Sequence, residues 1–401
     1  MPLPPTARRV LVAAAAIVLL AFVWLALPQT AKDFLLYAGH PPDPNCPVTY
    51  LEKLPTCKAA DGSETKVTIP NIVNYVFLLK DPESDFPFQF SHFLSMYSAY
   101  HFWNPDTIYL HTNVDVDSSP VRRAYAGQAG KWTRLIFGLP QLVINTVEVP
   151  EHANGINITM MEHKSDFIRV KMVHQYGGIY LDLDVQPLRS INALRHSGYH
   201  AIGGREFGFR DEKGVDHIGN LNSGTFMSVA GGAMITRWMQ RMNDVFDGSW
   251  VTHSNIALTA VAEELVASNA GPEARCEMLV LNRDGFAPGS WMDWDVSKLF
   301  DIQTETVTPE WPDADFRDGD PIPADLDLTP GVTPAWATNY NCTYLLHAFS
   351  PKKARNGASN NGINPRYVLE RKSNYARAVY PVARAMYNEG LLSLNDTDLG
   401  V

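Results

Sequence analysis

The chain has 401 residues, of which 45% are hydrophobic and 19% are charged, which is typical of a globular protein with one large domain or two smaller ones. The formal net charge of -10 and the lack of a basic stretch argue against a nucleic-acid partner, because such partners require Lys and Arg along a phosphate backbone. An acidic protein that binds a phosphorylated ligand needs a cation to offset the charge repulsion.

A long apolar run lies close to the N-terminus. Arg8 and Arg9 precede the run over residues 10–27, which would be about 27 Å long as a helix, close to the thickness of a hydrocarbon core. Because the positive charges come first, we expect a cytosolic tail over residues 1–9, a transmembrane anchor over residues 10–27 and a lumenal remainder. A cleaved signal peptide is the alternative, although no good Ala-x-Ala site follows the run. Both interpretations send the main domain into the secretory pathway.

Residues 28–66 are rich in Pro, Asp and Thr, and they predict a stem that leads to a globular domain over residues 67–401. Three N-glycosylation sequons agree with a secretory compartment, although each arises often by chance. The sequons begin at Asn157, Asn341 and Asn395.

The four cysteines form an even set, as expected where disulfides persist. Cys46 and Cys57 flank a short segment that contains Pro, and Cys276 and Cys342 remain. The simplest pairing is therefore Cys46–Cys57 with Cys276–Cys342, and four free buried thiols are the alternative. The sequence contains no Cys-x-x-Cys pair that would indicate zinc.

Predicted strands and helices alternate along the globular part. Apolar runs predict strands over residues 71–79, 107–111, 143–149, 179–185, 200–206 and 224–229. Helical spacing predicts helices over residues 88–102, 164–176, 233–246 and 254–267, with one or two more over 367–392. This order predicts an α/β domain around a mostly parallel sheet with flanking helices. In such sheets, ligands bind beyond the carboxyl ends of the strands.

Residues 164–184, KSDFIRVKMVHQYGGIYLDLD, carry the strongest signal of function. They predict a helix, a stop at Gly177 and Gly178 where a positive φ lets the backbone turn, and a buried strand that ends in Asp182 and Asp184. Side chains i and i+2 of a strand point the same way, so the two carboxylates would lie on one side, about 7 Å apart along the chain. Carboxylate oxygens suit Mg²⁺ or Mn²⁺, and these ions commonly carry a diphosphate.

Asp166 and Arg169 lie three residues apart, on one face of the predicted helix. In this prediction Ser165 caps the helix and Asp166 lies in its first turn, where the helix dipole favours a carboxylate. The two residues therefore have two possible roles. They bind a ligand, or they form a local ion pair that only supports the helix.

The whole string resembles the motif of the DXD sugar transferases of glycosyltransferase family 32. Their pattern is a small residue and Asp, then Arg three positions on, then Gly-Gly-Ile-Tyr-x-Asp-x-Asp, and this chain matches it with Ser165-Asp166, Arg169 and residues 177–184. The family includes fungal Golgi α-mannosyltransferases, inositolphosphoceramide mannosyltransferases, and animal α-1,4-galactosyl- and N-acetylglucosaminyltransferases. A looser resemblance spans residues 67–260.

The resemblance implies a Rossmann-like GT-A fold and a transfer that retains the anomeric configuration. By position, Asp166 and Arg169 would contact the hydroxyls of the donor sugar or the ribose. Asp182 would contact the ribose or a metal-bound water, and Asp184 would bind the Mn²⁺ (or Mg²⁺) that bridges the two phosphates. These four residues are the predicted catalytic set. The chemistry agrees, because a divalent cation stabilises the charge that builds on a nucleoside diphosphate as it leaves.

Weaker resemblances suggest further site residues. Val76 and Phe77 occupy the first-strand position where such enzymes hold the base, although a core strand explains them equally well. Asn222 opens a segment that would face donor and acceptor, with a polar turn as the alternative. His347 is the candidate third metal ligand, but the Ser-Trp pair often found with it in the family is missing, and a structural histidine is the alternative. The segment from His253 matches the acceptor side of the family only loosely.

We therefore expect a metal-dependent, retaining glycosyltransferase that moves a hexose from a nucleotide sugar to a glycan or glycolipid acceptor. GDP-mannose is the favoured donor, with UDP-sugars behind it, and the expected location is the Golgi membrane with a lumenal catalytic domain. A non-catalytic binding protein on the same fold is one alternative. A secreted metal-dependent hydrolase is another, and it would favour two adjacent metals and more His ligands. The sequence contains no clear nucleophile, which favours a front-face mechanism over a double displacement.

Overall fold

The computed structural model describes residues 57–58, 62–210, 216–217, 219–268, 276–304, 318–320, 322, 334–351 and 362–400. The predicted tail, the apolar run over residues 10–27 and most of the predicted stem lie outside these ranges. Within the described ranges, no helix combines the length and apolar character needed to cross a membrane.

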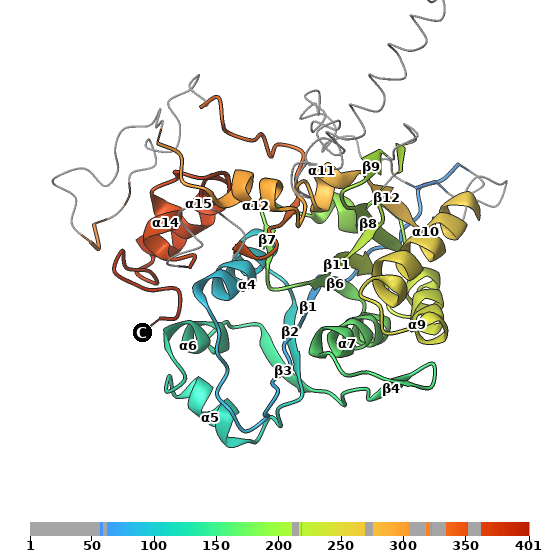
Figure 1. Ribbon diagram of the computed structural model, residues 1–401, viewed down its shortest axis with the longest axis horizontal. Helices are drawn as coiled ribbons and strands as arrows, with labels where there is room; N and C mark the ends of the chain where they lie inside the picture. Colours follow the sequence, from blue (N-terminus) through green and yellow to red (C-terminus); the bar gives the residue numbers. More distant parts are fainter. Residues whose placement is uncertain are drawn as a thin grey trace, which may run out of the picture.

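A seven-stranded sheet forms the centre of the domain (Figure 1). Its spatial order is β12 (Leu279–Leu281), β8 (Ala201–Arg205), β11 (Leu221–Ser228), β6 (Gly178–Leu181), β1 (Ile72–Val76), β2 (Thr107–Thr112) and β3 (Leu142–Thr146). All neighbouring pairs are parallel except those of β11, which runs antiparallel to both β6 and β8. The predicted mostly parallel sheet is confirmed, and the reversal of β11 is a feature that the sequence did not reveal.

Helices cover both faces of this sheet (Figure 1). One side carries α7 (Met161–Tyr176), α9 (Ala233–Val245) and α10 (Ala257–Ser268), and α10 follows a π-helical turn, η1 (Thr252–Ile256). The other side carries α4 (Phe90–Trp103), α5 (Ser119–Tyr125) and α6 (Lys131–Phe137). Helix α15 (Asn374–Asn388) packs on α4, and α12 (Asp293–Phe300) and α14 (Pro365–Leu369) pack on α15. The short helices α8 (Asn192–Arg195) and α11 (Arg283–Phe286) lie in connections. The long predicted helices are present, whereas α5, α6, α8, α11 and α12 were not predicted.

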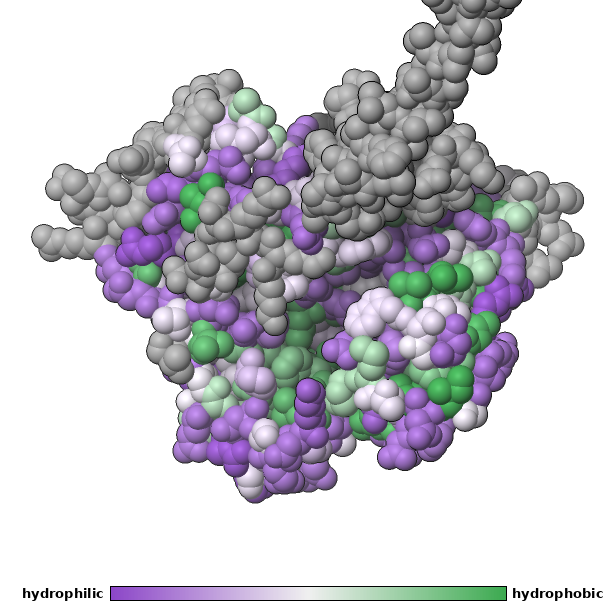
Figure 2. Space-filling view, in the orientation of Figure 1, coloured by the Kyte–Doolittle hydropathy of each residue, from purple (hydrophilic) through white to green (hydrophobic). Residues whose placement is uncertain are grey.

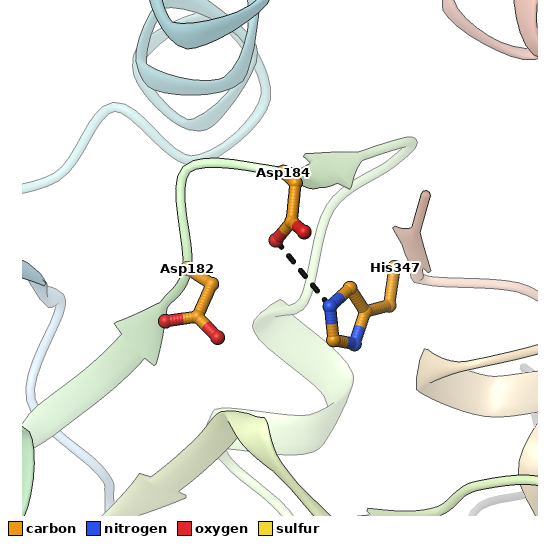
Figure 3. A group of neighbouring side chains, drawn as sticks. All are labelled: Asp182, Asp184 and His347. Atoms are coloured by element: carbon orange, nitrogen blue, oxygen red, sulfur yellow. Dashed lines mark ion pairs between the residues drawn. The ribbon is translucent and has the colours of Figure 1, made fainter. Parts of the chain in front are cut away.

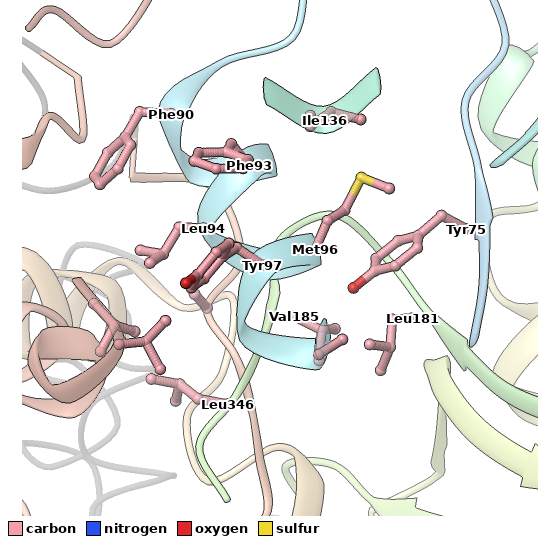
Figure 4. Close-up of a cluster of buried hydrophobic side chains, with 14 of the residues drawn as sticks. Tyr75, Phe90, Phe93, Leu94, Met96, Tyr97, Ile136, Leu181, Val185 and Leu346 are labelled. Carbon is pink, nitrogen blue, oxygen red and sulfur yellow. The ribbon is translucent and has the colours of Figure 1, made fainter. Parts of the chain in front are cut away.

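Alternate residues of the central strands enter two separate cores. On β6, Ile179 and Leu181 belong to the core on the α4 side, and Tyr180 belongs to the core on the α7 side. Figure 4 shows the first of these cores, where side chains of α4 face Leu181 of β6 and Tyr75 of β1. Burial on both faces explains why the predicted strands read as continuous apolar runs rather than as alternating ones.

The predicted strand over residues 179–185 is two strands. β6 ends at Leu181, a turn follows, and β7 (Val185–Pro187) then pairs with β13 (Leu345–His347) as a separate two-stranded sheet. The prediction of one continuous strand is therefore wrong, because β7 leaves the central sheet to pair with a segment far along the chain. Two further two-stranded sheets join β4 (His152–Ala153) to β5 (Ile156–Asn157) and β9 (Phe209–Arg210) to β10 (Asp216–His217).

Helix α7 begins one turn earlier than predicted. Its N-cap is Met160, so Ser165 does not cap the helix and Asp166 lies in its second turn rather than its first. The extra turn is held by tertiary packing, because the buried His163 contacts the rings of Phe246 and His253. The predicted helix stop is confirmed.

The glycine pair ends α7 as the sequence indicated. Gly177 has φ 67° and Gly178 has φ 94°, a left-handed backbone that L side chains rarely adopt. A Cβ on Gly178 would overlap the carbonyl oxygen of Ile72 on β1. The pair therefore serves both the turn and the close approach of β6 to β1.

The disulfide arrangement differs from both predicted pairs. Cys57 is bonded to Cys276, with a Cα–Cα distance of 5.7 Å, and Cys342 is also disulfide-bonded. The pairs Cys46–Cys57 and Cys276–Cys342 are therefore wrong, and so is the alternative of free thiols for these cysteines. Sequence proximity gave no guide, because Cys57 is held beside the connection after α8 by a hydrogen bond from its N–H to the carbonyl of Ser197, at 2.8 Å.

Candidate active site

A cavity of about 820 Å³ opens at the carboxyl ends of β1 and β6. The space-filling view shows apolar side chains in a hollow near the centre of the molecule, with hydrophilic side chains around it (Figure 2). The residues predicted for catalysis, donor binding and the metal all line this cavity, namely Val76, Phe77, Asp166, Arg169, Asp182, Asp184, Asn222 and His347. The fold therefore brings the whole predicted set to one place.

The two aspartates of the DXD motif lie in the turn between β6 and β7, not on a strand. The backbone N–H of Val185 donates to the carbonyl of Asp182 at 3.0 Å, and this closes the turn. His347 reaches the same point because β13 pairs with β7 and aligns His347 with Val185. Figure 3 shows the three side chains facing a common space. Their ligand atoms all lie within 4.8 Å of one another.

These three residues suit a divalent cation. Two carboxylates and one imidazole are ordinary ligands of Mn²⁺, and the carboxylates also suit Mg²⁺. The Oδ1 atom of Asp184 is buried without a well-formed hydrogen bond and lies 3.3 Å from Nε2 of His347. Burial would lower the pKa of His347, but the Asp184 carboxylate raises it above its ordinary value. A cation would replace the proton that the imidazole otherwise holds there.

Arg169 links helix α7 to the turn that carries Asp182 and Asp184. Its Nη2 atom lies 3.0 Å from Oδ1 of Asp166 and 3.2 Å from Oδ1 of Asp182, while Nη1 donates to the carbonyl of Ser223 at 3.0 Å. The guanidinium also stacks 4.7 Å from the ring centre of Tyr180. Burial would lower the pKa of Arg169, but the carboxylates, Asp182 first, raise it above its ordinary value. The alternative of a purely local helix ion pair therefore does not describe this residue.

Asp166 has a second partner that the sequence did not reveal. Nε2 of His253, a fully buried side chain on η1, lies 2.9 Å from Oδ2 of Asp166. The imidazole stacks on Phe167, with ring centres 5.4 Å apart and planes 5° apart. Because a carboxylate only accepts, Nε2 of His253 is the donor. His253 thus orients Asp166, whereas the sequence had placed it only loosely on the acceptor side.

A buried carboxylate, Glu206, also lines the cavity and was missed by the sequence analysis. It accepts hydrogen bonds from the side-chain amides of Asn222 at 2.9 Å and Asn255 at 2.8 Å. Burial raises the pKa of Glu206, and these two hydrogen bonds oppose that shift. An available signal was its place as the last residue of the predicted strand over residues 200–206.

The residues suggested for base binding serve the core and the cavity together. Val76 ends β1 and is buried, and Phe77 packs with its ring centre 4.5 Å from that of Phe88. Both also line the cavity, beside His92. A role in the core and a role in binding the base are thus compatible for Val76 and Phe77.

A mostly parallel α/β sheet carries an Asp-x-Asp turn at the end of its central strand, next to an Asp-x-x-Arg helix, and this is the arrangement expected from the resemblance to the DXD sugar transferases. In agreement, residues 88–200 match the model of a family described as a glycosyltransferase sugar-binding region containing a DXD motif. Glucan organizing enzyme 1 of Cryptococcus neoformans var. grubii serotype A is 27% identical over 199 residues, which cover 49% of this chain and 50% of that protein. The chain thus spans about half the length of this curated relative. These matches confirm the resemblance to glycosyltransferase family 32.

Solved glycosyltransferases overlap with the chain in part. PaToxG glycosyltransferase gives a TM-score of 0.34 at 9% identity and covers 50% of this chain and 71% of its own. The galactosyltransferase LgtC, in complex with donor and acceptor sugar analogues, gives 0.32 at 11% identity and covers 78% of this chain and 95% of its own. At such TM-scores the likeness supports no conclusion about the site.

Proposed function

We propose that this protein is a metal-dependent, retaining glycosyltransferase that moves a hexose from a nucleotide sugar to a glycan or glycolipid acceptor. The observation that carries the proposal is the convergence of Asp182, Asp184 and His347 within 4.8 Å, in a cavity that Asp166 and Arg169 also line. This combination offers a cation site for a diphosphate and a charged pair for sugar hydroxyls. GDP-mannose is the favoured donor because of the fungal relatives in the family, and UDP-sugars are the alternative.

Each part of the cavity has a role in this proposal. Asp184 and His347 would hold Mn²⁺ or Mg²⁺, with Asp182 bound directly or through water, and the ion would stabilise charge on the departing diphosphate. Asp166 keeps unused lone pairs on both carboxylate oxygens, although each already accepts one partner, so it accepts hydrogen bonds from sugar hydroxyls. Arg169 holds Asp166 and Asp182 at a fixed separation, and this positions the donor before transfer.

The front-face route to retention agrees with how the buried carboxylate Glu206 is held. A double displacement requires a carboxylate or similar group free to attack the anomeric carbon. Both oxygens of Glu206 accept amide hydrogen bonds, from Asn222 and Asn255, and these two contacts fix the orientation of the carboxylate. In the front-face route the leaving phosphate accepts the proton of the acceptor hydroxyl, and no protein nucleophile is needed.

We place the acceptor at the side of the cavity lined by Trp250, Glu162 and Ser254. Trp250 is 59% exposed although it packs on His163, with ring centres 5.7 Å apart. A sugar ring has an apolar C–H face and a hydroxyl edge, and an exposed indole and a carboxylate that line the same cavity suit both. This arrangement favours a glycan or the sugar headgroup of a glycolipid.

We also propose a Golgi location, with a single membrane span and a lumenal catalytic domain. The support is the apolar run over residues 10–27, together with the three sequon asparagines. Asn157, Asn341 and Asn395 are all exposed on the described surface, so a glycan would meet no buried packing there. Enzymatic removal of N-glycans from the expressed protein should increase its gel mobility, and an unchanged mobility would contradict the lumenal assignment.

A thermal-shift screen of the purified full chain tests the main proposal. GDP-mannose and the common UDP-sugars are each added with and without Mn²⁺, because a ligand that binds only the folded state raises the melting temperature. One nucleotide sugar should stabilise the protein only when Mn²⁺ is present. If no donor shifts the melting temperature of the folded protein, the non-catalytic alternative is favoured instead.

The hydrolase alternative gains no support from the metal ligands. Within the described ranges, Asp182, Asp184 and His347 are the only group of three potential ligands close enough to hold an ion. A two-metal hydrolase needs a second such group about 4 Å away. Product analysis separates the two activities, since a transferase forms a glycosylated acceptor whereas a hydrolase releases only free sugar.

A further inference from the structure

We propose that Glu206 is a positioning residue for the metal site, acting through Asn222 to fix His347 with Nδ1–H turned away from the cation and Nε2 turned toward it. This inference rests on the proposed metal site and names the residues that hold its histidine in place. The chain of contacts runs from a carboxylate to an amide to an imidazole, and each step fixes the orientation of the next group.

The first step is set by Glu206. Its side chain is 6% exposed, and its two oxygens each accept one amide, Oε2 from Nδ2 of Asn222 at 2.9 Å and Oε1 from Nδ2 of Asn255 at 2.8 Å. The side-chain NH₂ group of Asn222 is the donor to Glu206, and it therefore faces the carboxylate. The amide oxygen of Asn222 is therefore turned in the opposite direction.

The second step is set by that amide oxygen. Oδ1 of Asn222 accepts from the backbone N–H of Gly224 at 2.8 Å and lies 3.2 Å from Nδ1 of His347. Because an amide oxygen cannot donate, Nδ1 of His347 must carry the proton. Nε2 is then the ring nitrogen on the side of Asp184, 3.3 Å from its Oδ1, where the cation would bind. Outer partners of this kind orient metal-binding histidines in general.

These groups pack closely around Gly224. A Cβ on Gly224 would lie 2.7 Å from Oδ2 of Asp182, 2.9 Å from Oδ1 of Asn222 and 2.9 Å from Cε1 of His347. The backbone of this segment also reaches the DXD turn, because the N–H of Asp182 donates to the carbonyl of Gly224 at 2.8 Å. Three side chains therefore meet over one residue that has no side chain of its own.

Asn255, the second partner of Glu206, fixes the backbone at Ser223, next to Asn222. Its Oδ1 accepts from the backbone N–H of Ser223 at 3.2 Å, and the Ser223 carbonyl in turn accepts from Arg169 at 3.0 Å. The Glu206 carboxylate thus anchors both amides that define the path of this segment. In this role Glu206 acts by holding the two asparagines, each of which donates to one of its oxygens.

The variant Glu206→Gln tests the proposal with little change in volume. A glutamine has one oxygen, so it satisfies only one of the two asparagine amides, and the other loses its acceptor. We expect the affinity for Mn²⁺ alone, measured by titration calorimetry without any donor, to fall about 10- to 100-fold. The control is Glu263→Gln, which removes an exposed carboxylate paired with Arg205 and should leave Mn²⁺ affinity unchanged.

Electron spin-echo spectroscopy of bound Mn²⁺ gives a second readout that simple loss of stability would not mimic. The wild-type protein should show coupling to a histidine nitrogen, which disappears in His347→Gln and weakens in Glu206→Gln. Unchanged Mn²⁺ affinity and nitrogen coupling in folded Glu206→Gln would overturn this inference and leave the proposed function intact. If the wild-type protein binds no Mn²⁺, the metal-dependent function itself fails, and the inference fails with it.

Discussion

Two groups of residues build the site, and they make different contributions to it. The first is the motif segment, residues 161–184. The second is a set of distant partners, namely Glu206, Asn222, His253 and His347. The motif segment supplies Asp166, Arg169, Asp182 and Asp184 from one helix, a glycine stop, a strand and a turn. The distant partners come from four separate places in the chain, and each contacts a motif residue or another partner. The motif segment thus provides most of the charge, and the distant partners determine its orientation. If this division is right, variants of the two groups will differ in which kinetic or binding constant they change, as well as in the size of the change.

The largest effect should follow from Asp184→Ala in the motif segment. Removing this carboxylate takes away a proposed direct ligand, so we expect the Mn²⁺-dependent rate to fall at least about 10²-fold, as when other charge-stabilising groups are removed. Folding should be nearly unchanged, because the Asp184 side chain is 44% exposed and lies in a turn. Initial rates across a Mn²⁺ series and a thermal melt would measure both quantities. Asp117→Ala, in an exposed turn, is the control, and wild-type turnover in Asp184→Ala would refute the metal assignment.

A smaller effect is expected from Arg169→Lys, which keeps the charge of the motif segment but removes the planar fork. Lysine cannot bridge Asp166 and Asp182 while also donating to Ser223, so one or two charge-assisted hydrogen bonds are lost, at about 1.5–3 kcal/mol each. We expect kcat/KM for the donor to fall about 10- to 100-fold. Steady-state kinetics and urea unfolding should be compared. A large loss of stability with unchanged kinetics would show that the ion pair is only structural.

Among the distant partners, His253→Phe should raise the donor KM without changing the affinity for Mn²⁺. The phenyl ring preserves stacking on Phe167 but leaves Oδ2 of Asp166 without its donor, which costs about 1–3 kcal/mol. We expect a rise of about tenfold in the donor KM and an unchanged affinity for Mn²⁺. His152→Phe, at an exposed position, is the control. If Mn²⁺ affinity falls together with donor use, the roles of His253 and His347 are not separate, and the comparison breaks down.

The smallest effect should come from Trp250→Ala at the acceptor side. Loss of one aromatic contact with a sugar is worth about 0.5–1.5 kcal/mol, so the acceptor KM should rise about two- to tenfold. The donor KM should not change, since Trp250 contacts no residue of the proposed metal site among its described ring partners. Bisubstrate kinetics separate the two constants. A change confined to the donor KM would place Trp250 at the donor instead.

The sequence predicted the α/β class, the long elements and the motif segment, because these depend on local patterns. Apolar runs indicated the central strands β1, β2 and β6, and the glycine pair correctly predicted the end of α7. Two element boundaries were predicted wrongly where local patterns were insufficient. The strand over residues 179–185 is divided because β7 pairs with β13, and α7 gains a turn because His163 packs against distant rings.

Only the tertiary structure decided how the carboxylates of the site are oriented and balanced. Nothing in the spacing of the chain links Glu206 to Asn255, or His253 to Asp166, since each pair is separated by several secondary-structure elements. The same holds for the Cys57–Cys276 disulfide, which spans 219 residues. His347 could be suggested from a family resemblance, but its place beside Asp184 depends on the β7–β13 pairing. Local sequence fixes which charges are available, because backbone geometry and side-chain period act over a few residues. Their partners are fixed by packing, which brings distant segments together once the apolar surfaces are buried.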